Sequence, residues 1–170
     1  MIIAVIVIAV LVFIGFGAIF GAPYIPSHRK ELKALFDNAV HLTASDTVLD
    51  IGSGDGAVLR EASRRGARAV GYEIHPLFVW ISRILSSGDS NVSVRWANAW
   101  VAPFPQDVTV VYIFSVGRDN ARLAKKVQKE ANRLQKTLTL VCYGNPLRYI
   151  IAKQTYRAYS VYSFKPLHLK

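Results

Sequence analysis

A glycine-rich turn flanked by acids is the part of this sequence whose residue types and spacing predict chemistry. Glycines at alternate positions let a backbone turn sharply and approach a ligand closely. The turn, VLDIGSGDGA, contains Asp50, Gly52, Ser53, Gly54, Asp55, Gly56 and Ala57. Its G-x-G-x-G form is typical of a site for S-adenosylmethionine, and it also satisfies the looser G-x-G-x-x-G/A pattern of dinucleotide sites.

The two acids of this turn distinguish between the two ligands. A dinucleotide would bring a doubly negative pyrophosphate beside Asp50 and Asp55, and like charges a few ångströms apart repel by on the order of 1 kcal/mol even when partly screened. S-adenosylmethionine has no phosphate and carries an ammonium and a sulfonium, which suit carboxylates. The acids therefore favour S-adenosylmethionine as the cofactor. For Asp55, a simple role in shaping the turn or capping a helix is the alternative.

Further along the chain, an acid and a short loop are candidates for holding a nucleoside. Glu73 ends the next predicted strand, where a carboxylate can accept both ribose hydroxyl protons. NAD enzymes use an acid at the same place, so Glu73 does not choose between the cofactors. Asn98, followed by Ala99, is expected to pair its amide with the adenine edge, with an ordinary loop role as the alternative. Ile74 and Trp100 are candidates for sandwiching the adenine ring.

These candidates lie where strands are predicted to end. Strands and helices alternate along the chain, which indicates a parallel, doubly wound α/β sheet, and such sheets bind ligands beyond the carboxyl ends of their strands. The predicted strands cover 47–51, 68–73, 92–96, 107–114 and 137–143, and the predicted helices cover 32–40, 57–65, 76–87 and 118–136. Residues 148–164 are predicted to form a terminal antiparallel pair.

Composition excludes several classes of protein. The chain has 170 residues, of which 52% are hydrophobic, and a formal charge of +10. This aliphatic and aromatic content excludes an intrinsically disordered chain. Cys142 is the only cysteine, which excludes a disulfide scaffold and a Cys-based zinc site, and the scattered histidines show no ligand spacing. We expect no metal site.

The first part of the chain is apolar throughout. Residues 2–22 contain no charged side chain, and 21 helical residues span roughly 32 Å, the thickness of a hydrocarbon core. A cleaved signal peptide fits less well because no basic residue precedes the run. We expect a transmembrane anchor at 1–22 and a single domain at 23–170. Arg29 and Lys30 follow the segment, which predicts a single-pass membrane protein with a cytoplasmic domain.

A basic stripe follows the predicted helix 118–136 at helical spacing. Its members are Arg118, Arg122, Lys125, Lys129 and Arg133. A solvated outer face is one interpretation of the stripe. Contact with anionic lipid headgroups is another, since each such charge contributes roughly 1 kcal/mol near a membrane surface. Nucleic acid is a third, but we expect no nucleic-acid partner, because a domain tethered to a bilayer rarely needs one.

Four segments, in this order and spacing, resemble the membrane-anchored protein lysine methyltransferases: PYIPS, VLDIGSGDG, GYEIHPLFV and VRWANAW. The best-known members of that family modify the adenine nucleotide translocase and the ATP synthase c subunit. The resemblance covers residues 23–164, and we expect the chain to be a prokaryotic relative of this family. It implies a class I methyltransferase sheet, seven-stranded and Rossmann-like, preceded by one transmembrane helix, with S-adenosylmethionine as cofactor.

The resemblance assigns roles to individual positions. Asp50, Asp55 and the glycines between them match the family's loop around the methionine end of the cofactor, and Glu73 matches the ribose acid. Tyr24 matches the segment that covers the active site. Together with Phe114 and Ser115 it is expected to line the substrate pocket.

Two departures from the family pattern bear on the substrate. Asn98 stands where relatives usually have Asp, and the segment FSVGRDN at 114–120 lacks the Pro often seen there. We expect a protein-lysine N-methyltransferase that acts on a membrane-associated protein. The alternatives are methylation of a lipid or small apolar metabolite, and a basic membrane-surface binding module without catalysis.

Overall fold

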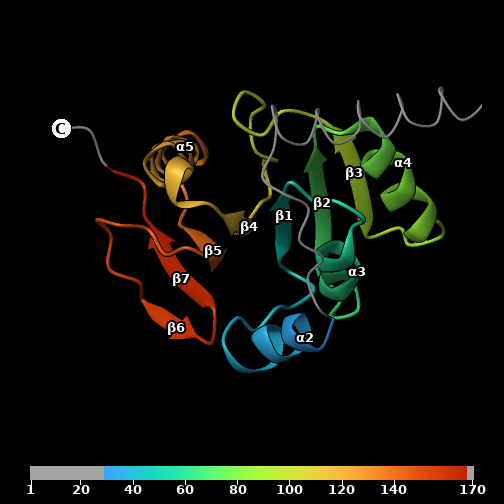
Figure 1. Cartoon of the computed structure of the whole chain (residues 1–170), viewed down its shortest axis with the longest axis horizontal. Coiled ribbons are helices and arrows are strands. Elements are labelled where there is room, and N and C mark those ends of the chain that lie inside the picture. The colour runs from blue at the N-terminus through green and yellow to red at the C-terminus, as the bar shows by residue number, and fades with distance from the viewer. Residues whose placement is uncertain (1–28, 168–170) are drawn as a thin grey trace, which may run out of the picture.

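A seven-stranded sheet organises the protein. The computed structural model describes residues 29–167, and its strands lie in the order β3-β2-β1-β4-β5-β7-β6 (Figure 1). The strands are β1 (Thr47–Ile51), β2 (Arg68–Glu73), β3 (Val92–Trp96), β4 (Val110–Ser115), β5 (Leu138–Gly144), β6 (Gln154–Tyr156) and β7 (Tyr159–Phe164). The helices are α2 (Arg29–Asn38), α3 (Ala57–Ser63), α4 (Pro76–Leu85), the short η1 (Gly117–Asp119) and α5 (Asn120–Leu134).

The expected seven-stranded, Rossmann-like α/β sheet is confirmed, and it is a mixed sheet with the antiparallel pair that was predicted within 148–164. The transmembrane helix expected before it falls outside the described residues. Strands β1 to β5 are parallel, whereas β7 is antiparallel to both β5 and β6. The parallel part reverses direction of winding at β1, so that β2 and β4 flank β1 on its two sides. Such a switch point leaves a crevice at the carboxyl ends of the strands, where the glycine-rich turn lies.

Helices cover the sheet on both faces. The apolar faces of α2, α3 and α4 pack on one side around Val48, Val110 and Val141. On the other side, α5 and the segment 97–108 pack around Leu49, Val111 and Leu140. Adjacent residues of one strand point to opposite faces, so β1, β2, β4, β5 and β7 contribute to both cores.

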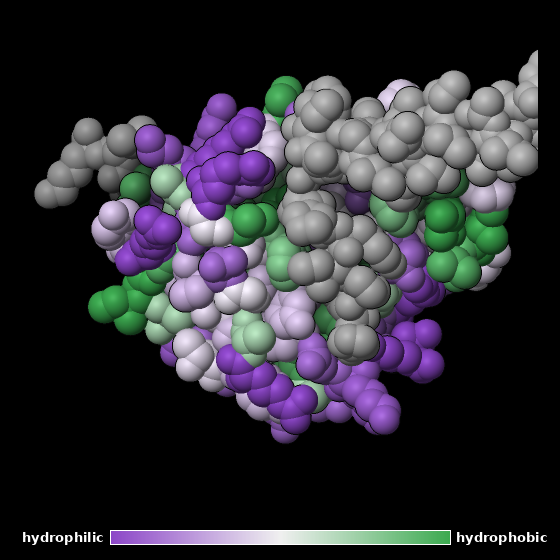
Figure 2. All heavy atoms as spheres, viewed as in Figure 1, coloured by the Kyte–Doolittle hydropathy of each residue, from purple (hydrophilic) through white to green (hydrophobic). Residues whose placement is uncertain are grey.

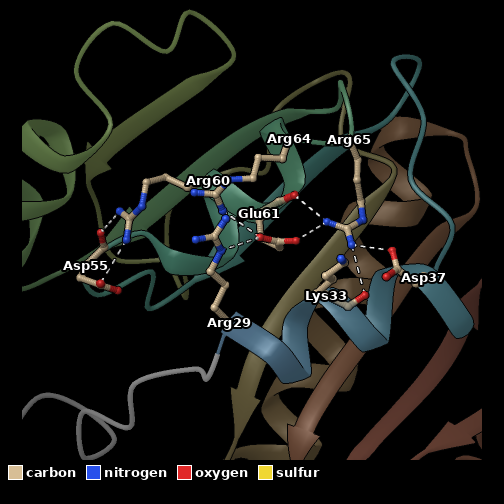
Figure 3. Close-up of polar contacts among 8 residues, drawn as sticks. All are labelled: Arg29, Lys33, Asp37, Asp55, Arg60, Glu61, Arg64 and Arg65. Atoms are coloured by element: carbon tan, nitrogen blue, oxygen red, sulfur yellow. Dashed lines mark hydrogen bonds and ion pairs between the residues drawn. The ribbon is translucent and has the colours of Figure 1, made fainter.

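A buried acid fastens α2 to α3. The carboxylate of Glu61, 5% exposed, pairs with Arg64 at 2.8 Å, with Arg65, and with Arg29 of α2 at 3.8 Å (Figure 3). Arg65 also reaches α2, where it donates to Asp37 at 2.7 Å and to a backbone carbonyl. These contacts hold α2 beside the helix that follows the glycine-rich turn.

The outer surfaces of α4 and α5 differ in character. On α4, large apolar side chains are exposed, and Figure 2 shows them together at the edge of the molecule. They are Leu77, Trp80, Ile84 and Leu85. Hydrophilic side chains gather over α5 in the same view. The basic stripe predicted there, Arg118 to Arg133, lies on exposed positions, with Arg118 in η1.

Several predicted boundaries differ from the observed ones by one to three residues, and those of β4 and α5 have identifiable causes. β4 begins at Val110 and not at Asp107, because the side chains of Asp107 and Thr109 form hydrogen bonds with the residues at the start of β1. There Asp107 accepts a hydrogen bond from Thr47, and Thr109 donates to Asp46. The predicted helix 118–136 begins at Asn120, after the 3-10 turn η1, and ends at Leu134.

The localisation expected from the sequence is wrong. No helix among residues 29–167 is long and apolar enough to cross a membrane. The expectation of a single-pass membrane protein with a cytoplasmic domain is therefore not retained. The segment 2–22, on which it rested, lies outside the described residues, as does Tyr24.

Candidate cofactor-binding site

The glycine-rich turn joins β1 to α3 through three left-handed residues. The φ angles are +76° at Gly52, +51° at Gly54 and +82° at Gly56, values at which any side chain would be strained. Among residues 29–167, no heavy atom outside Gly52 and its two chain neighbours lies within 4 Å of a Cβ added there. The backbone of Gly52 is therefore open to a ligand on the outer side of the turn.

The turn packs closely on β2. The backbone N–H groups of Gly52 and Ser53 both donate to the carbonyl of Tyr72, at 2.8 and 3.2 Å. A Cβ added at Gly71 would lie 2.5 Å from Ser53 Oγ and 2.7 Å from a methyl of Leu59. Ser53, predicted as a cofactor residue, thus directs its hydroxyl toward β2, and its side chain positions the turn.

Asp50 is a buried acid with no counter-ion among the described residues. It lies in β1 between Gly71 of β2 and Tyr112 of β4, and it is 3% exposed. Its carboxylate makes no hydrogen bond or ion pair with any of residues 29–167. Burial raises its pKa well above the usual value, and the charges of Glu73 and Asp55 raise it further. A cationic ligand group at this position would relieve that cost.

Glu73 closes the other side of the turn. Its Oε2 accepts the Gly54 N–H at 2.9 Å and its Oε1 accepts the His75 N–H at 2.8 Å. An ionised carboxyl group has about four acceptor positions, which leaves positions for ribose hydroxyls. Glu73 therefore lies where the sequence predicted, and it also orders the turn.

The side chain of Asp55 is hydrogen-bonded to residues of α3, the helix that follows it. Its carboxylate accepts a hydrogen bond from Arg60 at 3.2 Å (Figure 3). It also accepts one from the Ala57 N–H at 3.2 Å. The alternative raised at the level of sequence, a turn and capping role, describes these contacts. Arg60 was not singled out in the sequence, because a basic residue in a short surface helix carries no signal by itself.

The predicted adenine loop follows β3 and lies beside Glu73. The Ala97 N–H donates to the Glu73 carbonyl at 3.0 Å. Asn98 is exposed, and its Oδ1 accepts the Trp100 N–H at 3.0 Å; its amide N–H groups are the part that a ligand can use. Ala99 is buried. Trp100 lies under Arg122 of α5, 4.6 Å from ring centroid to guanidinium carbon.

Ile74 contributes its backbone to the same loop cluster. Its carbonyl accepts from the indole N–H of Trp96 at 2.9 Å, while 70% of Trp96 is exposed. Ile74 itself is half-buried. The two predicted sandwich residues thus lie on different loops, Ile74 after β2 and Trp100 in the loop of Asn98 after β3.

The predicted substrate residues have different surroundings at the end of β4. Phe114 is half-buried and packs against Tyr143. Ser115 is buried, and its hydroxyl donates to Asn120 Oδ1 at 2.8 Å. Asn120 in turn donates to the Pro146 carbonyl at 2.6 Å. The Ser115 hydroxyl is therefore engaged in joining β4 to α5 and to the loop after β5.

The residues present fit S-adenosylmethionine better than a dinucleotide. A buried carboxylate without a counter-ion suits the ammonium of the methionine end, and the remaining acceptor positions on Glu73 suit a ribose diol. Among the described residues, Arg60 is the basic side chain that contacts the turn, and it is already paired with Asp55. Within residues 29–167, no group of three or more His, Cys, Asp or Glu is arranged to hold a metal.

Comparison with known proteins agrees with this geometry. A family model, the ANTKMT methyltransferase domain, matches residues 50–148. The ATP synthase c-subunit lysine N-methyltransferase of Xenopus laevis is 34% identical over 113 residues, which are 64% of this chain and 48% of that protein. The human protein of the same name is 32% identical over 113 residues, 64% of this chain and 46% of that protein. The chain spans about half the length of these curated relatives.

Solved structures share the fold. An RNA methyltransferase from Salinibacter ruber, in complex with S-adenosylhomocysteine, superposes with a TM-score of 0.72 at 22% identity, over 86% of this chain and 97% of that one. A methyltransferase from Geobacter sulfurreducens, also with S-adenosylhomocysteine, gives a TM-score of 0.56 at 16% identity, over 76% of this chain and 55% of that one. The fold is thus that of S-adenosylmethionine-dependent methyltransferases.

Proposed function

Because the chain belongs to the ANTKMT methyltransferase family, we propose that it transfers a methyl group from S-adenosylmethionine to a lysine side chain of a protein. The observation that carries the proposal is the buried carboxylate of Asp50, without a counter-ion in residues 29–167, next to the open backbone of Gly52. The c-subunit lysine N-methyltransferases among its relatives support lysine as the acceptor. The acceptor that we propose is a membrane-associated protein.

The chain's own residues bind and orient in this mechanism. The cofactor, when bound, supplies a methyl group on a sulfonium. Asp50 pairs with the cofactor's ammonium, and Glu73 accepts hydrogen bonds from the ribose hydroxyls. With the cofactor bound, its methyl group would pass from sulfur to the neutral nitrogen of the acceptor, and that nitrogen would then lose a proton to solvent. Desolvation of the acceptor amine against the ring of Phe114 would favour the neutral amine by lowering its pKa.

Calorimetric titration with S-adenosylhomocysteine tests the cofactor. We expect micromolar binding to the full chain, unaffected by NAD, and no binding to the Asp50→Ala variant. Asp37→Ala is the matched control, because Asp37 is an exposed acid of α2 that pairs with Arg65. Absence of binding to the folded wild-type chain would contradict the proposal.

Labelling distinguishes a protein acceptor from a lipid or an apolar metabolite. Membranes incubated with the chain and tritiated S-adenosylmethionine are separated into protein and lipid extract. We expect the label in the protein, on methylated lysine after hydrolysis. Label in the lipid extract would favour the lipid alternative, and cofactor binding with no label in either fraction would favour the non-catalytic module.

We further propose that the basic stripe on α5 contacts an anionic surface such as lipid headgroups. Lys125 and Lys129 are exposed and form no ion pair with residues 29–167. Arg133, by contrast, is used internally by Glu130. Sedimentation with vesicles containing anionic lipid tests this: binding is expected to fall with salt and to weaken in Lys125→Ala/Lys129→Ala. Equal binding to neutral vesicles would contradict it.

A further inference from the structure

Four aromatic side chains cross the carboxyl edge of the sheet on the side of α2. This aromatic row consists of Tyr112 and Phe114 of β4, Tyr143 of β5 and Tyr159 of β7. Phe114, Tyr143 and Tyr159 are aligned across three strands. Ring centroids lie 5.7 Å apart for Phe114 and Tyr143, 4.9 Å for Tyr143 and Tyr159, and 6.4 Å for Tyr112 and Tyr159. The rings are therefore in mutual contact.

The aromatic row begins beside Asp50. Asp50 and Tyr112 are paired in parallel register, so their side chains leave the sheet on the same face. Phe114 lies two residues further along β4, on that same face and closer to the end of the strand, where it is half-buried. The row thus leads away from the place proposed for the cofactor's ammonium, toward β5 and β7.

A carboxylate lies against the aromatic row. The hydroxyl of Tyr143 donates to Oε2 of Glu31, in α2, at 3.3 Å. Glu31 is half-buried and forms no ion pair with any Lys or Arg of residues 29–167. The other acids of α2 and α3 differ from Glu31 in this respect, because Asp37 and Glu61 each form an ion pair with Arg65. An acid without a counter-ion beside aromatic rings is complementary to a cation on an apolar stem.

Resting on the proposed function, we propose that Phe114, Tyr143 and Glu31 form the binding site for the acceptor lysine. The rings pack against the aliphatic stem, and Glu31 attracts the ammonium group as the side chain enters. A lysine combines a compact positive charge with a four-carbon stem, which matches this pairing of rings and acid. A neutral lipid or metabolite would have no use for Glu31. The role of all three residues is binding, and none is assigned a proton transfer.

NMR titration of the full chain, saturated with S-adenosylhomocysteine, tests this site. The probes are Nα-acetyl-lysine N-methylamide and its uncharged counterpart Nα-acetyl-norleucine N-methylamide. We expect the lysine amide to shift the ring resonances of Phe114 and Tyr143 and to bind at least fivefold more tightly than the norleucine amide. Glu31→Gln is expected to remove this difference while leaving the affinity for S-adenosylhomocysteine unchanged.

Two further variants keep the test decisive. Asp37→Asn, which also removes an acid from α2, is expected to retain the preference for lysine. Tyr143→Phe keeps the ring and removes only the hydroxyl that positions Glu31, and is expected to reduce the preference in part even if Glu31→Gln folds poorly. Equal binding of the two amides to the wild-type chain, binding of neither, or a preference that survives both Glu31→Gln and Tyr143→Phe would overturn the inference. Failure to bind S-adenosylhomocysteine would instead contradict the proposed function.

Discussion

At the scale of single residues, Asp50 is expected to favour cofactor binding and to lower the stability of the ligand-free fold. Without a ligand it is a buried carboxylate whose pKa is raised by burial and by two neighbouring acids. A group whose pKa is raised on folding makes the fold less stable as the pH rises from its unfolded value to its folded value. We therefore expect Asp50→Asn to stabilise the ligand-free chain at pH 7 by on the order of 1 kcal/mol, and to weaken S-adenosylhomocysteine binding by tenfold or more.

Thermal unfolding and calorimetry check this prediction, with Asp55→Asn for comparison. Arg60 already neutralises Asp55, so Asp55→Asn is expected to weaken cofactor binding less than Asp50→Asn and to stabilise nothing. A loss of stability in Asp50→Asn, or equal effects of the two variants on binding, would contradict the assignment of the ammonium to Asp50.

The positions of Asp50, Glu73 and Phe114 were predictable because each follows from its place at the end of a predicted strand. The partners of the other candidates were not. Nothing in the sequence shows that Arg60 pairs with Asp55, or that the Ser115 hydroxyl donates to Asn120. These contacts depend on side-chain directions and compete with ligand binding for the same atoms. Glu31 was missed for a different reason: it is 112 residues from Tyr143, and only the packing of α2 brings them together.

At the scale of elements, the approach of the glycine-rich turn to β2 depends on Gly71. A methyl group there would lie 2.5 Å from Ser53 Oγ and 2.7 Å from Leu59, so Gly71→Ala must displace the turn or β2. Overpacking of a closed site costs about 1–3 kcal/mol. We expect a lower unfolding midpoint in urea together with weaker binding of S-adenosylhomocysteine.

Gly117→Ala is the matched control for Gly71→Ala. At Gly117 an added methyl group would have no neighbour closer than 3.8 Å among the described residues, and the backbone φ is not positive. This variant is expected to keep the wild-type unfolding midpoint. If Gly71→Ala binds S-adenosylhomocysteine as tightly as wild type, the turn does not need its close contact with β2.

The docking of α2 on α3 rests on Glu61. This buried acid is bound by Arg64 and Arg65 and lies 3.8 Å from Arg29. A hydrogen bond to a charged group contributes about 1.5–3 kcal/mol, and Arg29 and Arg64 remain exposed to water when Glu61 is removed. Glu61→Ala is therefore expected to lower the free energy of unfolding by roughly that amount, measured by urea denaturation. Asp37→Ala removes an exposed partner of the same Arg65 and is expected to cost below about 1 kcal/mol. Similar losses in the two variants would contradict this account.

The parallel core of the sheet follows from alternation of apolar runs and helical faces, and its five strands were predicted within three residues of their observed starts. The terminal strands β6 and β7 were predicted only as an antiparallel pair. Their placement beside β5 depends on long-range pairing, such as Tyr143 with Tyr159, which has no local signal. The aromatic row exists only because of that pairing, which is why the sequence did not reveal it.

At the scale of the whole molecule, buried carboxyl groups on the two faces of the sheet give opposite dependences on pH. Asp50 faces α3, and Glu130 lies under the segment 97–108 on the side of α5. Burial by itself would raise the pKa of Glu130, but hydrogen bonds from Arg133, Lys126 and the Phe104 N–H outweigh it, and the net pKa is lowered. Glu130 thus stabilises the fold above its unfolded pKa, and that stabilisation is lost as the pH falls through its folded pKa.

We therefore expect Glu130→Gln to destabilise the chain by about 1.5–3 kcal/mol at pH 7, the contribution typical of hydrogen bonds to a charged group. The difference from wild type should shrink as the pH falls from the unfolded pKa of Glu130 through its lowered folded pKa, below which the carboxyl group is protonated in both states. Urea denaturation at a series of pH values measures this difference, with Asp119→Asn as a control, because Asp119 pairs with the exposed Arg118.

Combining Glu130→Gln with Asp50→Asn tests whether the two faces act independently. The two residues lie on opposite sides of the sheet and share no partner among the described residues, so their effects on stability should add. The double variant should then show a flatter dependence of stability on pH than the wild-type chain, since a lowered and a raised pKa have both been removed. A steep loss of stability at acid pH that persists in the double variant would place the acid sensitivity of the fold elsewhere.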